Sequence, residues 1–107
     1  LWKSDGTAAG TVLIKDIKPG TGSSNLKHFT KVNNILYFSA DNGTNGAELW
    51  RSDGTAAGTV MVKDFNASMS SNPSNLINLN GVLYFSTDDG TNGVGKKHQH
   101  QRQFIAF

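Results

Sequence analysis

The sequence contains the same twelve-residue phrase twice, starting at Leu1 and again at Leu49, with one conservative substitution. A second segment, residues 35–46, returns 47 residues later as residues 82–93. Self-similarity with a period of about 40 to 50 residues is typical of arrays in which each unit buries its apolar face against its neighbours. This repetition restricts the fold more strongly than any local pattern. It predicts two tandem repeats of 47–48 residues over residues 1–93, with the second beginning near residue 49.

Each repeat has the composition of four short strands joined by turns. Runs of β-branched and aromatic residues alternate with stretches rich in glycine, serine, threonine and asparagine, which is typical of an all-β protein. In the first repeat these runs predict strands near residues 11–16, 28–33, 35–40 and 47–52. Four antiparallel strands per repeat is the content of a β-propeller blade. We therefore expect an all-β chain of about two tandem, four-stranded antiparallel blades.

The repeated phrase also carries a family resemblance. Residues 48–55 read Glu-Leu-Trp-Arg-Ser-Asp-Gly-Thr, and residues 1–7 are a shortened copy of them. This phrase resembles the repeat family that takes its name from the consensus Glu-Leu-Trp-x-x-Asp-Gly-Thr, found in large, mostly secreted bacterial proteins. The resemblance covers residues 1–93 and implies β-propeller-like blades, a secreted or cell-surface location, and a role in binding or adhesion. The family has no general catalytic motif that the resemblance would bring to this chain.

Both ends of the sequence depart from the repeat pattern. The chain begins inside the phrase, which predicts a fragment whose blades pack against further repeats of a parent array. After Gly93 no third Leu-Trp phrase follows, and residues 94–107 contain three basic residues and no acidic one. Because residues 94–107 lack turn residues and a consistent period, we expect a divergent tail, disordered or loosely docked, that a frameshift or an incomplete gene model would produce.

The composition argues against several classes of function. Residues 1–93 are nearly neutral, with seven Lys or Arg against eight Asp or Glu, so we expect no nucleic-acid partner. No apolar run is long enough to span a membrane. The absence of cysteine removes disulfides, thiolate chemistry and the usual zinc sites.

Two acidic loops are the candidate sites for chemistry. They partly match the Asp-box of other propellers, and they offer oxygen ligands of the kind that calcium binds, from Asp41, Asn42, Asn45, Glu48, Asp88, Asp89 and Asn92. Calcium requires about six to eight oxygens, and the second loop has Gly95 where the first has Glu48. We therefore prefer turns in which the aspartates accept hydrogen bonds from backbone amides, with no cofactor, and keep calcium as the alternative.

The most variable loops, residues 17–28 and 65–75, are the expected binding surface, whereas Trp2 and Trp50 are expected to fill the space between blades. The sequence thus favours a non-catalytic scaffold that binds an extracellular polymer, a glycan or a protein through these loops. The alternative is a fragment of a propeller enzyme such as an Asp-box glycosidase. Identical repeats argue against an enzyme, because a catalytic site needs titratable residues that occur in one copy only.

Overall fold

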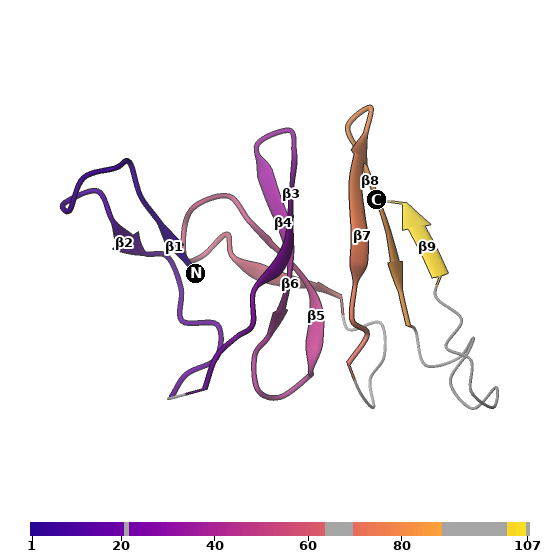
Figure 1. Cartoon of the computed structure of the whole chain (residues 1–107), viewed down its shortest axis with the longest axis horizontal. Helices are drawn as coiled ribbons and strands as arrows, with labels where there is room; N and C mark the ends of the chain where they lie inside the picture. Colours follow the sequence, from indigo (N-terminus) through magenta and orange to yellow (C-terminus); the bar gives the residue numbers. More distant parts are fainter. Residues whose placement is uncertain (21, 64–69, 89–102, 107) are drawn as a thin grey trace.

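The computed structural model describes residues 1–20, 22–63 and 70–88, together with the backbone of residues 103–106. Within these residues the chain forms nine strands and no helix (Figure 1). Every strand pair is antiparallel, and the strands form three sheets that follow one another along the chain. The all-β, antiparallel part of the expected fold is confirmed. No closed sheet is present among the described strands.

The central sheet has four strands in the order β3-β4-β5-β6. Their bounds are β3 Lys27–Val32, β4 Ile35–Asp41, β5 Ala47–Ser52 and β6 Val60–Lys63. A tight turn at Asn33-Asn34 joins β3 to β4, and Asn33 takes a φ of 56°, which asparagine tolerates better than most residues. Strands were expected near three of these places, residues 28–33, 35–40 and 47–52, but the fourth strand comes from the start of the second repeat.

The strand expected at residues 11–16 was therefore assigned to the wrong sheet. Only β2 (Val12–Leu13) forms there, and it pairs with β1 (Trp2–Lys3) in a two-stranded first sheet. The same pairing recurs in the central sheet, where β6 pairs with β5. In both places the loop between the two strands is closed by its own hydrogen bonds, so the strand after the loop pairs with the strand before it.

The last sheet has the order β7-β8-β9 and includes a strand from the tail. Its strands are β7 Ser74–Leu79, β8 Val82–Thr87 and β9 Gln103–Ala106. The tail was expected to be disordered or loosely docked, yet residues 103–106 pair antiparallel with β8. The other tail residues, 94–102 and 107, lie outside the described part of the chain.

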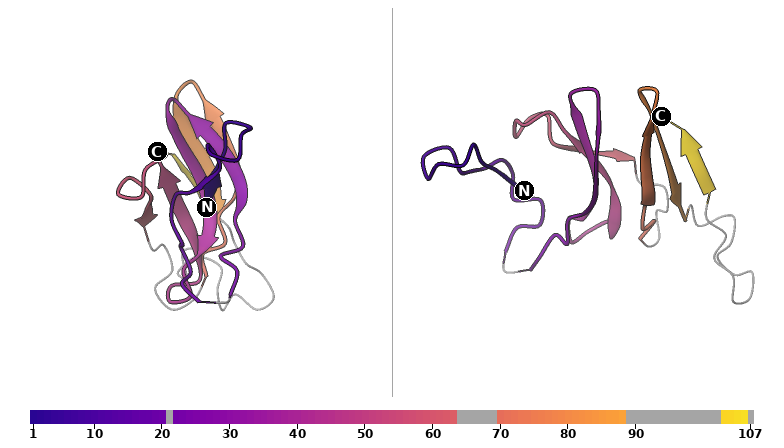
Figure 2. Two further views of the ribbon diagram at one scale, coloured as in Figure 1. Left: turned by 90° about the vertical axis from the view of Figure 1, so that its left-hand side faces the viewer. Right: turned by 45° about the horizontal axis from the view of Figure 1, so that its top comes forward.

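The central sheet lies between the other two sheets along the molecule (Figure 2), and two clusters of apolar side chains form on its two faces. One cluster, between the central sheet and the segment that joins the first sheet to it, contains Ile17, Phe38, Ala40 and Trp50. The other, between the central and last sheets, contains Val32, Leu49, Leu83 and Phe85. Because side chains alternate along a strand, β4 contributes Phe38 to the first cluster and places Tyr37 against the second.

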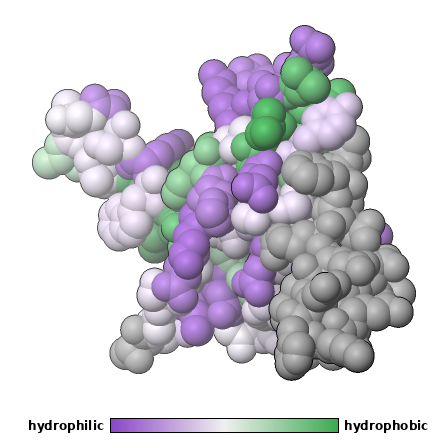
Figure 3. Space-filling model, turned by 45° about the vertical axis from the view of Figure 1, so that its right-hand side comes forward, coloured by the Kyte–Doolittle hydropathy of each residue, from purple (hydrophilic) through white to green (hydrophobic). Residues whose placement is uncertain are grey.

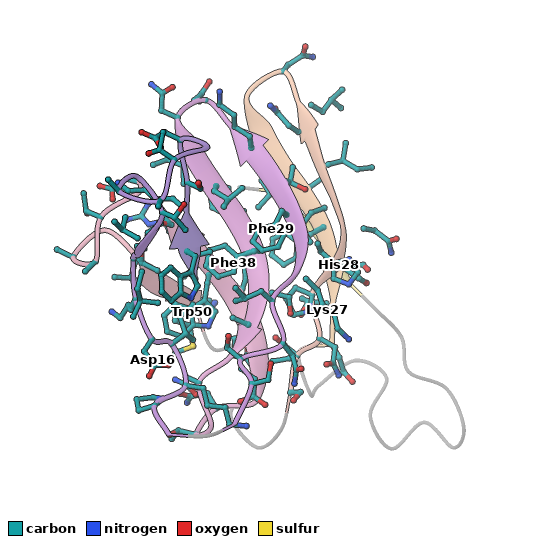
Figure 4. All side chains as sticks on the ribbon, turned by 60° about the vertical axis from the view of Figure 1, so that its left-hand side comes forward. Asp16, Lys27, His28, Phe29, Phe38 and Trp50 are labelled. Atoms are coloured by element: carbon teal, nitrogen blue, oxygen red, sulfur yellow. The ribbon has the colours of Figure 1, made fainter. Side chains whose placement is uncertain are left out.

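Phe38 also contacts Phe29 of β3, with ring centroids 5.6 Å apart (Figure 4). Trp50 is almost fully buried beside this pair, as expected of a packing residue. Its copy Trp2 is instead 64% exposed, because no further sheet covers the outer face of β1 among the described residues.

Candidate functional site

The acidic loop after β4 uses its oxygens to build a turn. Asp41 Oδ1 accepts a hydrogen bond from the Gly43 backbone N–H at 2.7 Å. Asn42 Oδ1 accepts from the backbone N–H groups of Thr44 and Asn45, both at 2.9 Å, and its amide donates to Asn45 Oδ1. These are the bonds of an Asx turn, the role that the sequence favoured for this loop.

Glu48 and Asp88 are the other calcium candidates that the structure describes, and both make hydrogen bonds with Ser71. Glu48 is fully buried, and its carboxylate accepts hydrogen bonds from the backbone N–H and hydroxyl of Ser71, at 3.1 and 2.6 Å. The Asp88 backbone N–H donates to the Ser71 carbonyl at 2.9 Å. Asp89 and Asn92 lie outside the described residues. Over residues 1–20, 22–63 and 70–88, no group of three or more His, Cys, Asp or Glu is placed to hold a metal ion.

The Asp-Gly-Thr phrase builds the same closed loop in both copies. Asp53 Oδ1 accepts from the backbone N–H and the hydroxyl of Thr55, at 3.0 and 2.7 Å, and Thr55 Oγ1 accepts from Gly58 N–H at 2.9 Å. The loop that starts at Asp5 repeats these bonds at 3.0, 2.6 and 2.9 Å. A Cβ at Gly58 would lie 2.0 Å from Asp53 Oδ1, so the glycine is required by the space inside the loop. The Asp-Gly-Thr phrase thus has a structural role in both copies, which is to close this loop.

These hydrogen bonds predict that the loops loosen in acid. The hydroxyl and then the backbone N–H of Thr55 lower the pKa of Asp53, and Thr7 does the same for Asp5. A carboxylate whose pKa is lowered by folding stabilises its loop above the unfolded-state pKa, about pH 4. That stabilisation is lost as the pH falls through the folded-state pKa. In an NMR titration the Thr55 and Gly58 amides of the wild type should shift below about pH 4.

An Asp53→Asn variant is the matched control, because asparagine keeps an acceptor oxygen but does not titrate. In this variant the chemical shifts of the Thr55 and Gly58 amides should stay constant over the same pH range, while those of the loop at Asp5 still change. A wild-type midpoint above the ordinary aspartate pKa would contradict the proposed role of these bonds.

A polar groove between the central and last sheets is the other candidate site, and we call it the inter-sheet groove. Its volume is about 440 Å³. One wall comes from the central sheet and the segment before it, and the other from the segment that leads into β7. The lining residues are Asn25, Lys27, His28, Ser39, Asp41 and Ala47 on the first wall, and Ser70, Asn72, Pro73 and Ser74 on the second.

Left-handed residues and irregular strand pairing shape both walls in the same way. Asn25 and Asn72 occupy equivalent places before β3 and β7, with φ values of 52° and 48°. His28 and Asn75 are a second equivalent pair, at 61° and 56°, and each lies where the pairing of its strand shifts register. Such bulges redirect side chains at the end of a strand. Figure 4 shows Lys27 and His28 together on β3, away from the cluster around Trp50.

Residues from both loops that differ most between the two repeats line the groove. Asn25, Lys27 and His28 belong to residues 17–28, and Ser70 and Asn72 to residues 65–75. The sequence indicated each loop separately, but the meeting of the two follows from the stacking of the sheets. Ser39, Asp41 and Ala47 were not foreseen as lining residues, and the signals that could have pointed to them are the predicted end of the third strand and the predicted start of the fourth.

These observations define the class of the chain: an all-β stack of antiparallel sheets with a polar groove between two of them. Comparison with models of protein families, with curated proteins and with solved structures finds no match to it. A search of the described residues finds no helix with the length and apolar character needed to cross a membrane.

Proposed function

We propose that the chain is a non-catalytic scaffold of β-propeller-like blades that binds a hydroxyl-rich polymer, a glycan, in the inter-sheet groove. One observation carries this proposal: residues from both variable loops line the same polar groove. The residues that the two copies share in the twelve-residue phrase and in the apolar runs have structural roles. They close the Asp-Gly-Thr loops and fill the space between the sheets.

The chemistry of the lining favours sugar hydroxyls as ligands. Serine, asparagine and histidine side chains can both donate and accept hydrogen bonds, and a sugar hydroxyl needs both. Lys27, His28 and Asp41 are the titratable residues of the lining, so it carries charge of both signs. Substitutions at the lining would change which ligand binds without disturbing the apolar clusters, as expected of a scaffold whose binding loops vary in sequence.

The location of such a scaffold follows from the family resemblance. Repeats that resemble this phrase belong to large, mostly secreted bacterial proteins, so the proposal places the scaffold outside the cell or on its surface. Adhesion to an extracellular polymer is the role that fits this location.

Binding can be tested by titrating the chain with soluble oligosaccharides, neutral and acidic, while NMR follows the backbone amides of Asn25 and Asn72. Asn25→Gly removes a side-chain amide from the groove and keeps the left-handed backbone, which glycine adopts readily. We expect it to weaken binding about tenfold, the equivalent of one or two hydrogen bonds. His28→Asn, which copies Asn75 of the second repeat, should change the preference among sugars.

The matched control is Asn33→Gly, the same change at another left-handed asparagine, in the turn between β3 and β4 and outside the groove lining. It should bind like the wild type. Equal weakening by Asn25→Gly and Asn33→Gly, or shifts confined to amides outside the groove, would reject this binding site.

A further inference from the structure

Apolar side chains that are buried inside the stack are exposed at its two ends. Trp2 is 64% exposed and its copy Trp50 only 6%. Leu79 of β7 is 55% exposed, whereas Val32, at the same place in β3, is 6% exposed. Figure 3 shows apolar surface over the upper part of the last sheet, beside the residues drawn in grey. Each end of the stack therefore presents a surface that the fold covers in its interior.

The first and last sheets contain complementary halves of the central sheet. The β7-β8 hairpin repeats β3-β4: Val82 pairs with Leu79 in it as Ile35 pairs with Val32 in the central sheet. The β1-β2 hairpin repeats β5-β6: Trp2 pairs with Leu13 in it as Trp50 pairs with Met61. Side by side, the two hairpins would make the four-stranded order of the central sheet.

Strand β9 occupies the position at which the two halves would join. In the central sheet, Phe38 lies opposite Trp50 and Ser39 opposite Leu49. In the last sheet, Phe85 lies opposite Ile105 and Ser86 opposite Phe104. Residues 103–106 therefore hold the β8 edge in the register that a Glu-Leu-Trp strand takes in the central sheet.

We propose that the β8 edge is a docking site for the β1-β2 hairpin of a second copy of this chain, which displaces β9. In the composite sheet β7-β8-β1-β2, Trp2 of the second copy would lie opposite Phe85, as Trp50 lies opposite Phe38. The second copy is the occupant because the register, the strand order and the exposed apolar residues all match an arrangement that the chain already contains. This inference does not depend on the inter-sheet groove.

The composite sheet would cover the exposed residues at both ends. Trp2 and Leu13 of the second copy would face the central sheet of the first copy, as Trp50 and Met61 face the cluster that contains Ile17. The central sheet of the second copy would cover Leu79 and Tyr84, the counterparts of Val32 and Tyr37. The joined surfaces differ from each other, so each copy leaves one free end, and such heterologous contacts produce rings or open chains of copies.

Sedimentation of the 107-residue chain over a range of concentrations tests this docking, together with the tryptophan fluorescence that reports burial of Trp2. We expect a concentration-dependent series of oligomers with a blue shift. A double substitution, Phe104→Pro with Ile105→Pro, should strengthen association at least about tenfold by releasing the β8 edge. Successive N–H groups of a strand point to opposite sides, so one of the two prolines removes a hydrogen bond to β8.

Trp2→Ser should abolish association and leave the fold of the single copy intact, because Trp2 is exposed there. The matched control is Val12→Ser: Val12 is 40% exposed and its copy Val60 is still 36% exposed in the complete central sheet, so this change should have no effect. A monomer at all concentrations in the double proline variant would overturn the proposal. So would association that survives Trp2→Ser, since a different surface would then make the contact.

Discussion

Replacing Trp50 with alanine is expected to lower the free energy of unfolding by about 3 to 5 kcal/mol. The indole is 6% exposed and packs with Ile17, Phe38 and Ala40, on the face of the central sheet that the segment after β2 covers. Its Nε1 has no hydrogen-bond partner among the described residues, so the loss is one of packing and cavity formation. Because small domains are stable by only about 5 to 15 kcal/mol, this single change removes much of the total.

Urea denaturation followed by circular dichroism measures the loss, and Trp2→Ala is the matched control. It deletes the same side chain from the same phrase, but Trp2 is exposed in the single copy, so the change should stay within about 0.5 kcal/mol at a dilution at which the chain is monomeric. Trp50→Phe should cost less than Trp50→Ala, because it keeps most of the buried area and removes an unsatisfied N–H. Equal costs at Trp2 and Trp50 would contradict the packing role.

The comparison of Trp2 with Trp50 also shows how far the sequence could predict the fold. The runs of β-branched and aromatic residues located the β3-β4 hairpin, because strand propensity and turn chemistry are local. The sheet to which residues 11–16 belong depends on hydrogen bonds that close the loop before them. Burial of a repeated residue depends on what packs against its sheet. Trp2 and Trp50 therefore differ in exposure although their phrases are nearly identical.

In the tail and the candidate sites, too, features set by local sequence could be predicted, whereas those that depend on contacts between distant segments could not. Residues 103–106 have a strand-like composition but no partner nearby in sequence, and their pairing depends on the open edge of β8. Similarly, the acidic loops could be interpreted as turns from their Asx and glycine content alone. The inter-sheet groove could not be predicted, since residues about one repeat apart form it when two sheets stack.

Glu48 gives a second large effect, because it links the central sheet to the segment that leads into the last sheet. Its carboxylate binds the Ser71 hydroxyl at 2.6 Å and the Ser71 N–H at 3.1 Å. The Ser71 carbonyl in turn accepts from the Thr87 hydroxyl at 3.0 Å, on β8. Glu48 and Ser71 are both fully buried, so their hydrogen bonds have no competition from water.

We expect Glu48→Ala to cost about 2 to 3 kcal/mol, since hydrogen bonds to a charged group contribute more than neutral ones. Glu48→Gln keeps the shape and one acceptor oxygen, but its amide NH₂ cannot accept from Ser71, so its cost should be intermediate. Ser71→Ala and the double variant complete a thermodynamic cycle, for which we expect a coupling energy of about 1 to 2 kcal/mol. Additive losses would show that the two residues stabilise the fold separately.

The same cycle has a consequence for the inter-sheet groove. Ser70 and Asn72, on either side of Ser71, line the groove wall that the Glu48 carboxylate holds in place. Glu48→Ala should therefore increase hydrogen exchange at the amides of residues 70–74 more than at those of β3, because local opening is easiest where buried contacts are lost. Uniform acceleration over both walls would mean that Glu48 stabilises the whole stack and does not position the groove.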